Sequence, residues 1–203
     1  MMTSAPDPSV LLDHRGAPRP RMETSLDYEH ARLGLAFHEA GHAVLSMAYG
    51  FHVLASQVIA WEPEPGRYTV TGNTSFQVQG QIPVWRFAAQ AAAGQAAQVR
   101  YLMAYGLWTP DRAAACAADH DREHAIDVLD GLGVRLGRDH VPVGGKSWAM
   151  VRGVASRKIG YLWREIRTVA HAMAEHDKLT GDEIAALTGL TNPAIDSLTG
   201  GAA

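Results

Sequence analysis

The chain has 203 residues, of which 47% are hydrophobic and 19% charged, and its formal net charge is −3. This composition is typical of a globular domain, with no dense basic run to support nucleic-acid binding and no run of about 18 apolar residues to span a membrane. The single cysteine, Cys116, excludes an intramolecular disulfide, and the first residues lack the apolar core of a signal peptide. We therefore expect a cytoplasmic protein with neither a nucleic-acid partner nor a membrane span.

Residues 1–23 are rich in proline, aspartate and arginine, and they predict a flexible tail. Residues 24–27 (TSLD) match a capping box, in which the Thr hydroxyl and the Asp carboxylate accept hydrogen bonds from free backbone N–H groups. Apolar residues then recur at helical spacing, which predicts a helix from about residue 26 to 49. Gly50 is placed to end it.

Residues 53–79 contain a different period. The stretch "RYTVTGNTSFQVQ" alternates apolar and polar side chains, which is the two-residue period of a half-exposed strand, and "EPEPGR" before it predicts a turn. We expect two or three antiparallel strands here. Gly72 is expected at a bulge or kink, because glycine inside a strand commonly marks one.

Helical patterns return after Pro83. The Ala-rich residues 84–106 predict one closely packed helix, and residues 111–133 predict another. After the loop "VPVGGKS", apolar residues recur every three to five positions over 148–176, which predicts one long amphipathic helix.

A second capping box, "TGDE" from Thr180, predicts a short helix to about Leu187. The whole pattern predicts one mainly α domain with a small antiparallel β-sheet over residues 24–190. Residues 191–203 are expected to form a C-terminal tail.

The sequence "FHEAGH" places His38 and His42 one helical turn apart, so both imidazoles lie on one face. Neutral imidazole nitrogens are good zinc ligands, and H-E-x-x-H on a helix is the zinc-peptidase signature. Glu39 projects beside the pair, where it can deprotonate a water whose pKa zinc lowers toward 7. The alternative is an ordinary helix with partly buried histidines. Gly41 argues against it, because glycine inside a helix costs up to about 1 kcal/mol and indicates a packing reason.

A catalytic zinc site needs a third protein ligand, with water in the fourth position. His52, just after the predicted helix, is one candidate, and "DHDREH" over 119–124 is a denser source of candidates. Within it, "HDREH" forms the inverted zinc-peptidase pattern, with His120 and His124 as ligands and Glu123 as base. Neighbouring helix positions diverge by about 100°, so these side chains cannot all face one metal. The residues alone leave open which motif forms the site, or whether one supplies a ligand to the other.

The segment "AFHEAGHAVLS" resembles the active-site helix of the FtsH-type zinc metallopeptidases. The segments "VLASQVIAW" and "TVTGNTSFQ" are similar to the strand pair that follows it in that family, and "AAAGQAAQ" is similar to its small-residue helix. "AADHDREHAIDVL" resembles the family's third-ligand segment, and "VAHAMAEHDKLTGDEIAAL" its C-terminal end. The resemblance covers about residues 30–188 and implies a zincin-like FtsH-type peptidase domain.

Carried onto this sequence, the resemblance implies Zn²⁺ bound by His38, His42 and Asp121, with Glu39 as the catalytic base. It therefore favours the HEAGH motif over the HDREH motif as the site.

Two features depart from the family pattern. The sequence contains neither the transmembrane segments nor the AAA+ ATPase module that precede the family's peptidase domain, and "VGGKS" does not supply a P-loop, since His140 stands where the first glycine is needed. The family commonly has a glutamate where this chain has Gln98. An amide is a weaker acceptor behind a metal-bound histidine, which bears on metal affinity and rate.

These expectations favour a zinc-dependent endopeptidase that hydrolyses flexible or unfolded polypeptides without an ATPase of its own, served where needed by a separate unfoldase or adaptor. The alternative is a catalytically degenerate domain that binds peptides or a partner protein. Gln98 and the missing ATPase favour that alternative, whereas Glu39 favours catalysis, because a binding domain has no need of it. A third interpretation is a small helical interaction module without metal. Family peptidase domains assemble as rings, so an oligomer is compatible with the sequence.

Overall fold

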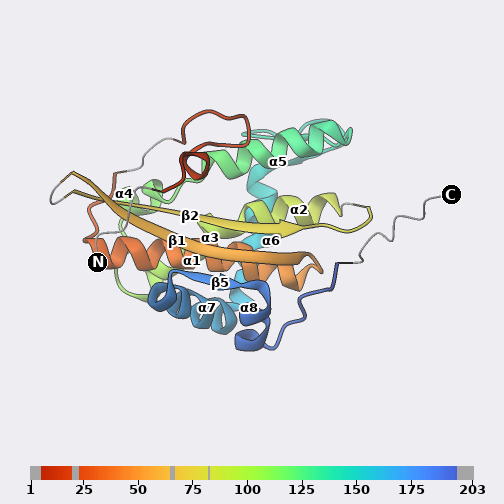
Figure 1. Cartoon of the computed structure of the whole chain (residues 1–203). Helices are drawn as coiled ribbons and strands as arrows, with labels where there is room; N and C mark the ends of the chain where they lie inside the picture. The colour runs from red at the N-terminus through yellow and green to blue at the C-terminus, as the bar shows by residue number, and fades with distance from the viewer. Residues whose placement is uncertain (1–5, 20–22, 65–66, 82, 196–203) are drawn as a thin grey trace.

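The computed structural model describes residues 6–19, 23–64, 67–81 and 83–195 (Figure 1). Its helices are η1 (Pro8–Leu11), α1 (Tyr28–Ala48), α2 (Val84–Ala91), α3 (Ala93–Ala104), α4 (Pro110–Ala115), α5 (Asp119–Gly131), α6 (Trp148–Tyr161), α7 (Trp163–His176) and α8 (Gly181–Thr188). Its strands are β1 (His52–Glu64), β2 (Arg67–Gln77), β3 (Leu136–Gly137), β4 (Lys146–Ser147) and β5 (Lys178–Thr180). The predicted class, helices with a small antiparallel sheet, is confirmed.

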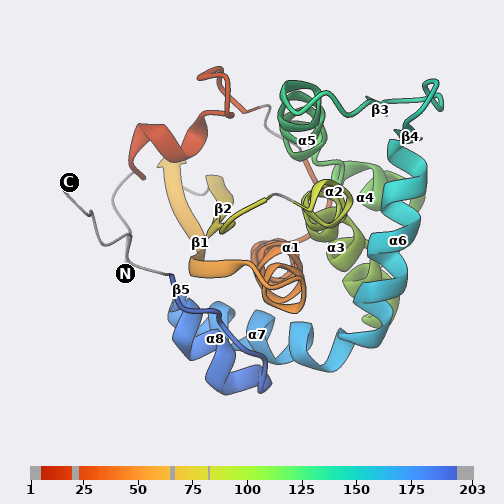
Figure 2. The same ribbon diagram turned by 90° about the vertical axis from the view of Figure 1, so that its right-hand side faces the viewer.

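Helix α1 is the centre of the fold (Figure 2). The sheet covers one side of it, α7 and α8 cover a second side, and α2 and α3 cover a third. Residues 36–47 are buried all round, so this part of the helix has no solvent-facing side. The helical spacing of apolar residues predicted the helix but not burial on all its sides. The polar side chains of residues 36–47 are consequently enclosed by other elements.

The start of α1 differs from the prediction. Asp27 is the N-cap, and its carboxylate accepts a hydrogen bond from the N–H of His30 at 2.9 Å. The capping box predicted at Thr24 was wrong, because the Thr24 hydroxyl instead accepts from the N–H of Leu26 in a local turn. At the other end, Gly50 has a φ of 81°, in the left-handed region that favours glycine, and ends the helix as predicted.

The main sheet has the strand order β2-β1-β5, and both pairings are antiparallel. Strand β5 was not predicted, because it has three residues and no visible alternation. It leads into α8 through the capping box predicted at Thr180, which is confirmed by reciprocal hydrogen bonds with Glu183. Strand β2 has no partner strand on its outer side among the described residues.

Gly72 is not at a bulge. It pairs in regular register with Val58, and the register shifts lie elsewhere, between Val53 and Ala55 and between Trp61 and Glu64. A Cβ atom built on Gly72 would lie 2.5 Å from Cγ and Oε1 of Glu39. The glycine therefore makes room for a side chain of α1, and backbone irregularity is not its role.

Each of the three long helices predicted after Pro83 is broken in two. The breaks lie at Ala92, at residues 116–118 and at Leu162. Apolar residues continue on both sides of the Leu162 break, because α6 packs on α2 and α3 while α7 packs on α1. The spacing of apolar residues in the sequence therefore continues through positions where the chain changes direction, and it does not reveal the breaks.

Residues 6–19, predicted as part of a flexible tail, form η1 and a bridge between Leu12 and Pro18. This segment lies over β2 and beside α5 in both views (Figures 1 and 2). The predicted loop "VPVGGKS" ends in β4, which pairs with β3 in parallel. No helix in the described part of the chain is long and apolar enough to cross a membrane.

Candidate metal centre

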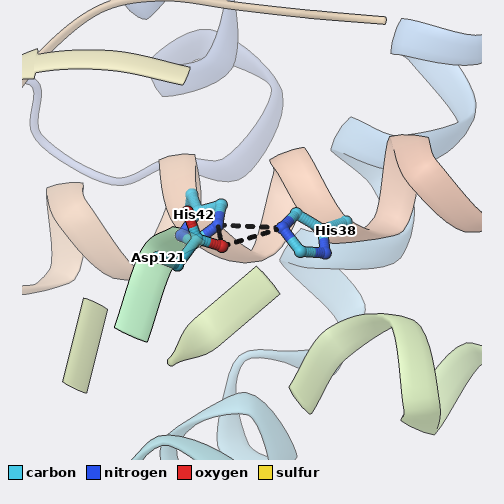
Figure 3. A group of neighbouring side chains, drawn as sticks. All are labelled: His38, His42 and Asp121. Atoms are coloured by element: carbon cyan, nitrogen blue, oxygen red, sulfur yellow. Dashed lines mark hydrogen bonds and ion pairs between the residues drawn. The ribbon is translucent and has the colours of Figure 1, made fainter. Parts of the chain in front are cut away.

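Three side chains from two elements meet at one point (Figure 3). His38 and His42 come from α1, and Asp121 comes from the first turn of α5. The two Nε2 atoms lie 3.1 Å apart, and Oδ2 of Asp121 lies 3.3 Å from that of His38 and 3.2 Å from that of His42. Ligand atoms about 2.0–2.1 Å from a tetrahedral zinc ion lie about 3.3 Å from one another. The spacing of the three atoms therefore fits one zinc ion.

Backbone and side-chain oxygens fix the orientation of both imidazoles. Nδ1 of His42 donates to the carbonyl of Gln90 at 2.9 Å, and Nδ1 of His38 donates to Oε1 of Gln98 at 3.2 Å. Because each Nδ1 carries a proton, Nε2 is the ring atom of each imidazole that can give a lone pair to a metal ion. A cation holds the two Nε2 atoms and the Asp121 carboxylate together, either a second proton on His42 or a metal ion.

Two of the helix breaks, at Ala92 and at residues 116–118, allow the candidate ligands and their hydrogen-bond partners to meet. Because the helix is interrupted at Ala92, the Gln90 carbonyl is available to His42. The break at residues 116–118 separates α4 from α5, which begins at Asp119. Asp121 therefore lies in a first helical turn, where the helix dipole favours a carboxylate. Neither break was predicted, and no pattern in the sequence indicates that the carbonyl of Gln90 accepts from His42.

Glu39 lies beside the three candidate ligands without joining them. The residue is 5% exposed, and its Oε2 accepts a hydrogen bond from Oγ1 of Thr74 at 2.7 Å. Thr74 is held in turn by Ser56, whose Oγ lies 2.8 Å from Oγ1. One carboxylate oxygen of Glu39 is thus fixed by β2. Nothing in the alternating pattern of this strand predicts the contact between Thr74 and Glu39.

The candidates of the second motif do not join this group among the described residues. His120 lies 3.3 Å from the other carboxylate oxygen of Asp121, and His124 stacks on His14. Glu123 pairs with Arg138. His52, at the start of β1, bonds through Nδ1 to the carbonyl of Pro193.

Gly94 on α3 faces the metal group, which is the set of candidate ligands His38, His42 and Asp121, and this position was not predicted from the sequence. A Cβ atom on Gly94 would overlap Nε2 of both His38 and His42. We expect Gly94→Ala to abolish stoichiometric zinc binding while leaving a folded protein, because the methyl group would fill the space of the ion. Gly153→Ala is the matched control, since nothing lies within 4 Å of its added Cβ. Zinc content and circular dichroism of both variants measure this, and normal zinc loading of Gly94→Ala would contradict the assigned position.

Charges around the group shift the pKa values of its members. Burial lowers the pKa of His42, but the Asp121 carboxylate and its hydrogen bond outweigh burial and raise it to about 9. Burial raises the pKa of Asp121, but His42 and His38 hold it well below the ordinary value. Burial also lowers the pKa of His120 to about 4, so that imidazole is neutral near pH 7. In the metal-free protein, the imidazole of His42 is therefore protonated on both ring nitrogens at neutral pH.

Zinc binding should therefore release a proton. Below pH 9 the raised pKa keeps His42 protonated, and zinc needs the lone pair that this proton occupies. We expect zinc affinity to rise about tenfold per pH unit between pH 6.5 and 8.5, and to level off above pH 9. Calorimetric zinc titrations in buffers of different ionisation enthalpy at pH 7.5 measure the protons released, and release of none would contradict the assignment.

Gln98 allows a test of the support behind His38. Gln98→Ala removes the acceptor of Nδ1, and we expect zinc affinity to fall about tenfold, in the range typical for groups that orient a metal-bound histidine. Gln98→Glu strengthens the acceptor and should raise affinity. Competition with a chromogenic chelator measures the zinc affinity of both variants. If both affinities equal that of the parent protein, the contact between Gln98 and His38 has no effect on zinc binding.

A cavity of ≈ 270 Å³ opens beside the group. Glu39, His42, His120 and Asp121 line it, together with Gly72 and Thr74 of β2 and residues of the N-terminal segment. The candidate ligands and the carboxylate beside them therefore border one space, which is large enough for part of a small ligand.

No protein-family model matches the chain, and no curated protein matches it at a significant level.

Proposed function

We propose that the protein is a zinc-dependent endopeptidase with a zincin-like, FtsH-type peptidase domain that acts on flexible or unfolded polypeptides. One observation carries the proposal: the Nε2 atoms of His38 and His42 and a carboxylate oxygen of Asp121 lie within 3.3 Å of one another, with Glu39 beside them. Two histidines and a carboxylate leave one position open on a tetrahedral ion, which is the donor set of a catalytic zinc site.

When bound, zinc would polarise the scissile carbonyl and lower the pKa of a water molecule. Glu39 would take a proton from that water and pass it to the leaving amine, as a general base and then a general acid. The hydrogen bond from Thr74 holds one oxygen of Glu39, so the other remains for this transfer.

The outer edge of β2 is a suitable place for the substrate backbone. The N–H of Val58 donates to the carbonyl of Asp177, so the backbone groups of Val58 face β5. Its partner Gly72 then directs its own N–H and carbonyl to the outer edge of the sheet, beside Glu39. An extended peptide added to this edge would bring its scissile bond to the metal group through main-chain hydrogen bonds.

The test is cleavage of fluorescein-labelled β-casein, an unfolded polypeptide, by zinc-loaded protein. We expect cleavage that a chelator abolishes and that stoichiometric zinc restores. Cleavage that survives complete removal of the metal would contradict the proposal.

A second function is favoured by one observation, the amide of Gln98 as the acceptor behind His38. A domain that binds polypeptides without cutting them would load one zinc ion per chain and bind casein. It would release no fragments, even when supplied with a separate unfoldase.

A further inference from the structure

The N-terminal segment, residues 6–19, is held to α5 by a cluster of polar contacts. Arg15 forms two hydrogen bonds to the carboxylate of Asp127, through Nε and Nη2, each of 2.7 Å. Nε2 of His14 lies 2.7 Å from the same carboxylate. Hydrogen bonds from Arg15 and then His14 hold the pKa of Asp127 far below its usual range. We call these contacts of His14 and Arg15 with Asp127 the Asp127 clasp, because they hold residues 6–19 to α5.

The same segment reaches the substrate edge of β2. Nη1 of Arg19 lies 3.4 Å from the carbonyl oxygen of Gly72, and Nε of Arg19 donates to the carbonyl of Leu12 at 2.9 Å. The Gly72 carbonyl is the outward-facing acceptor that an added substrate strand would use. A guanidinium of the protein's own chain therefore occupies that acceptor.

The segment also reduces the space beside the metal group. Leu12, His14 and Arg19 line the cavity that Glu39 and Asp121 border. The cavity of ≈ 270 Å³ is smaller than the roughly 300–1,000 Å³ usual for ligand pockets, and an extended polypeptide needs more room than one small ligand. A substrate chain and residues 12–19 cannot both lie along this part of β2.

We propose that residues 6–19 are a built-in competitor of the polypeptide substrate, which blocks the β2 edge until the Asp127 clasp opens. The inference rests on the proposed function only for the identity of the competing ligand, an unfolded polypeptide. In this proposal the protein with a free β2 edge is the active form. The protein whose residues 6–19 are held to Asp127 is the resting form.

The test measures polypeptide binding, so that it does not depend on catalysis. In full-length, zinc-loaded protein that carries Glu39→Gln, the affinity for fluorescein-labelled β-casein is measured by anisotropy. Asp127→Ala opens the clasp, and Asp130→Ala is the control, an exposed aspartate three residues further along α5. Trypsin cleavage after Arg15 reports separately whether the segment is released.

We expect Asp127→Ala to speed cleavage after Arg15 and to tighten casein binding about fivefold, with Asp130→Ala like the parent. His14→Ala with Arg15→Ala opens the clasp from the other side and should tighten binding equally. A peptide of residues 6–19 added to that double variant should displace casein, whereas the same peptide with both alanines should not. Unchanged trypsin cleavage in Asp127→Ala overturns the clasp. A released segment with unchanged or undetectable casein binding overturns the competition.

If these binding results are obtained but the wild-type protein does not cleave casein, the proposed peptidase function is wrong. The inference that residues 6–19 compete with a polypeptide for the β2 edge then still stands.

Discussion

Glu39→Gln is expected to lower the rate of β-casein cleavage roughly 10³-fold while zinc content stays at one ion per chain. The amide is nearly the same size and keeps an oxygen that can accept from Thr74, so the local packing is preserved. It cannot take up a proton, so the transfer from water to the leaving amine is lost.

Cleavage of labelled casein and metal analysis on the same preparations measure the two effects. Glu29→Gln is the matched control, because Glu29 is an exposed carboxylate in the first turn of α1. Retained cleavage by Glu39→Gln would remove Glu39 from the mechanism. Loss of zinc together with activity would instead indicate that Glu39 supports the metal group.

Asp121→Ala is expected to weaken zinc binding by more than about 100-fold and to abolish cleavage at ordinary zinc concentrations. Loss of a supporting group behind a ligand weakens binding by about 10- to 100-fold, and loss of the ligand itself should exceed that range. The variant also removes a negative charge from beside two buried imidazoles, so the remaining pair holds a dication less well.

Asp119→Ala provides the comparison, since Asp119 lies in the same first turn of α5 with a 61% exposed side chain paired to Arg122. Competition with a chromogenic chelator gives the affinities of both variants. His120→Ala extends the comparison to the neighbour of Asp121 that does not join the metal group, and its zinc stoichiometry should be normal. Equal affinities for Asp121→Ala and Asp119→Ala would exclude Asp121 as a ligand.

The histidine pair could be predicted from the sequence because its geometry is local. Two residues four apart on a helix share a face whatever the rest of the chain does, so the meeting of His38 and His42 follows from spacing alone. Asp121 lies 79 positions beyond His42, and no local rule reports that separation. Only the resemblance to a family singled it out from its neighbours.

The parts that the sequence did not predict depend on tertiary contacts. Ala92 and Leu162 interrupt helices whose apolar period continues on both sides, so no change of pattern marks either break. Gly72 and Gly94 are small because Glu39 and the two histidines lie against them, and those neighbours come from another element. The ordering of residues 6–19 depends on a carboxylate on α5 and the edge of β2, to which a Pro-rich composition gives no clue.

The central claim is that His38, His42 and Asp121 bind one zinc ion with one position left open. Zinc-edge X-ray absorption of protein loaded with one equivalent tests it most directly. We predict four nitrogen or oxygen neighbours at about 2.0–2.1 Å, with the outer-shell scattering of two imidazoles. A sulfur neighbour at about 2.3 Å, or a shell with no imidazole scattering, would contradict it.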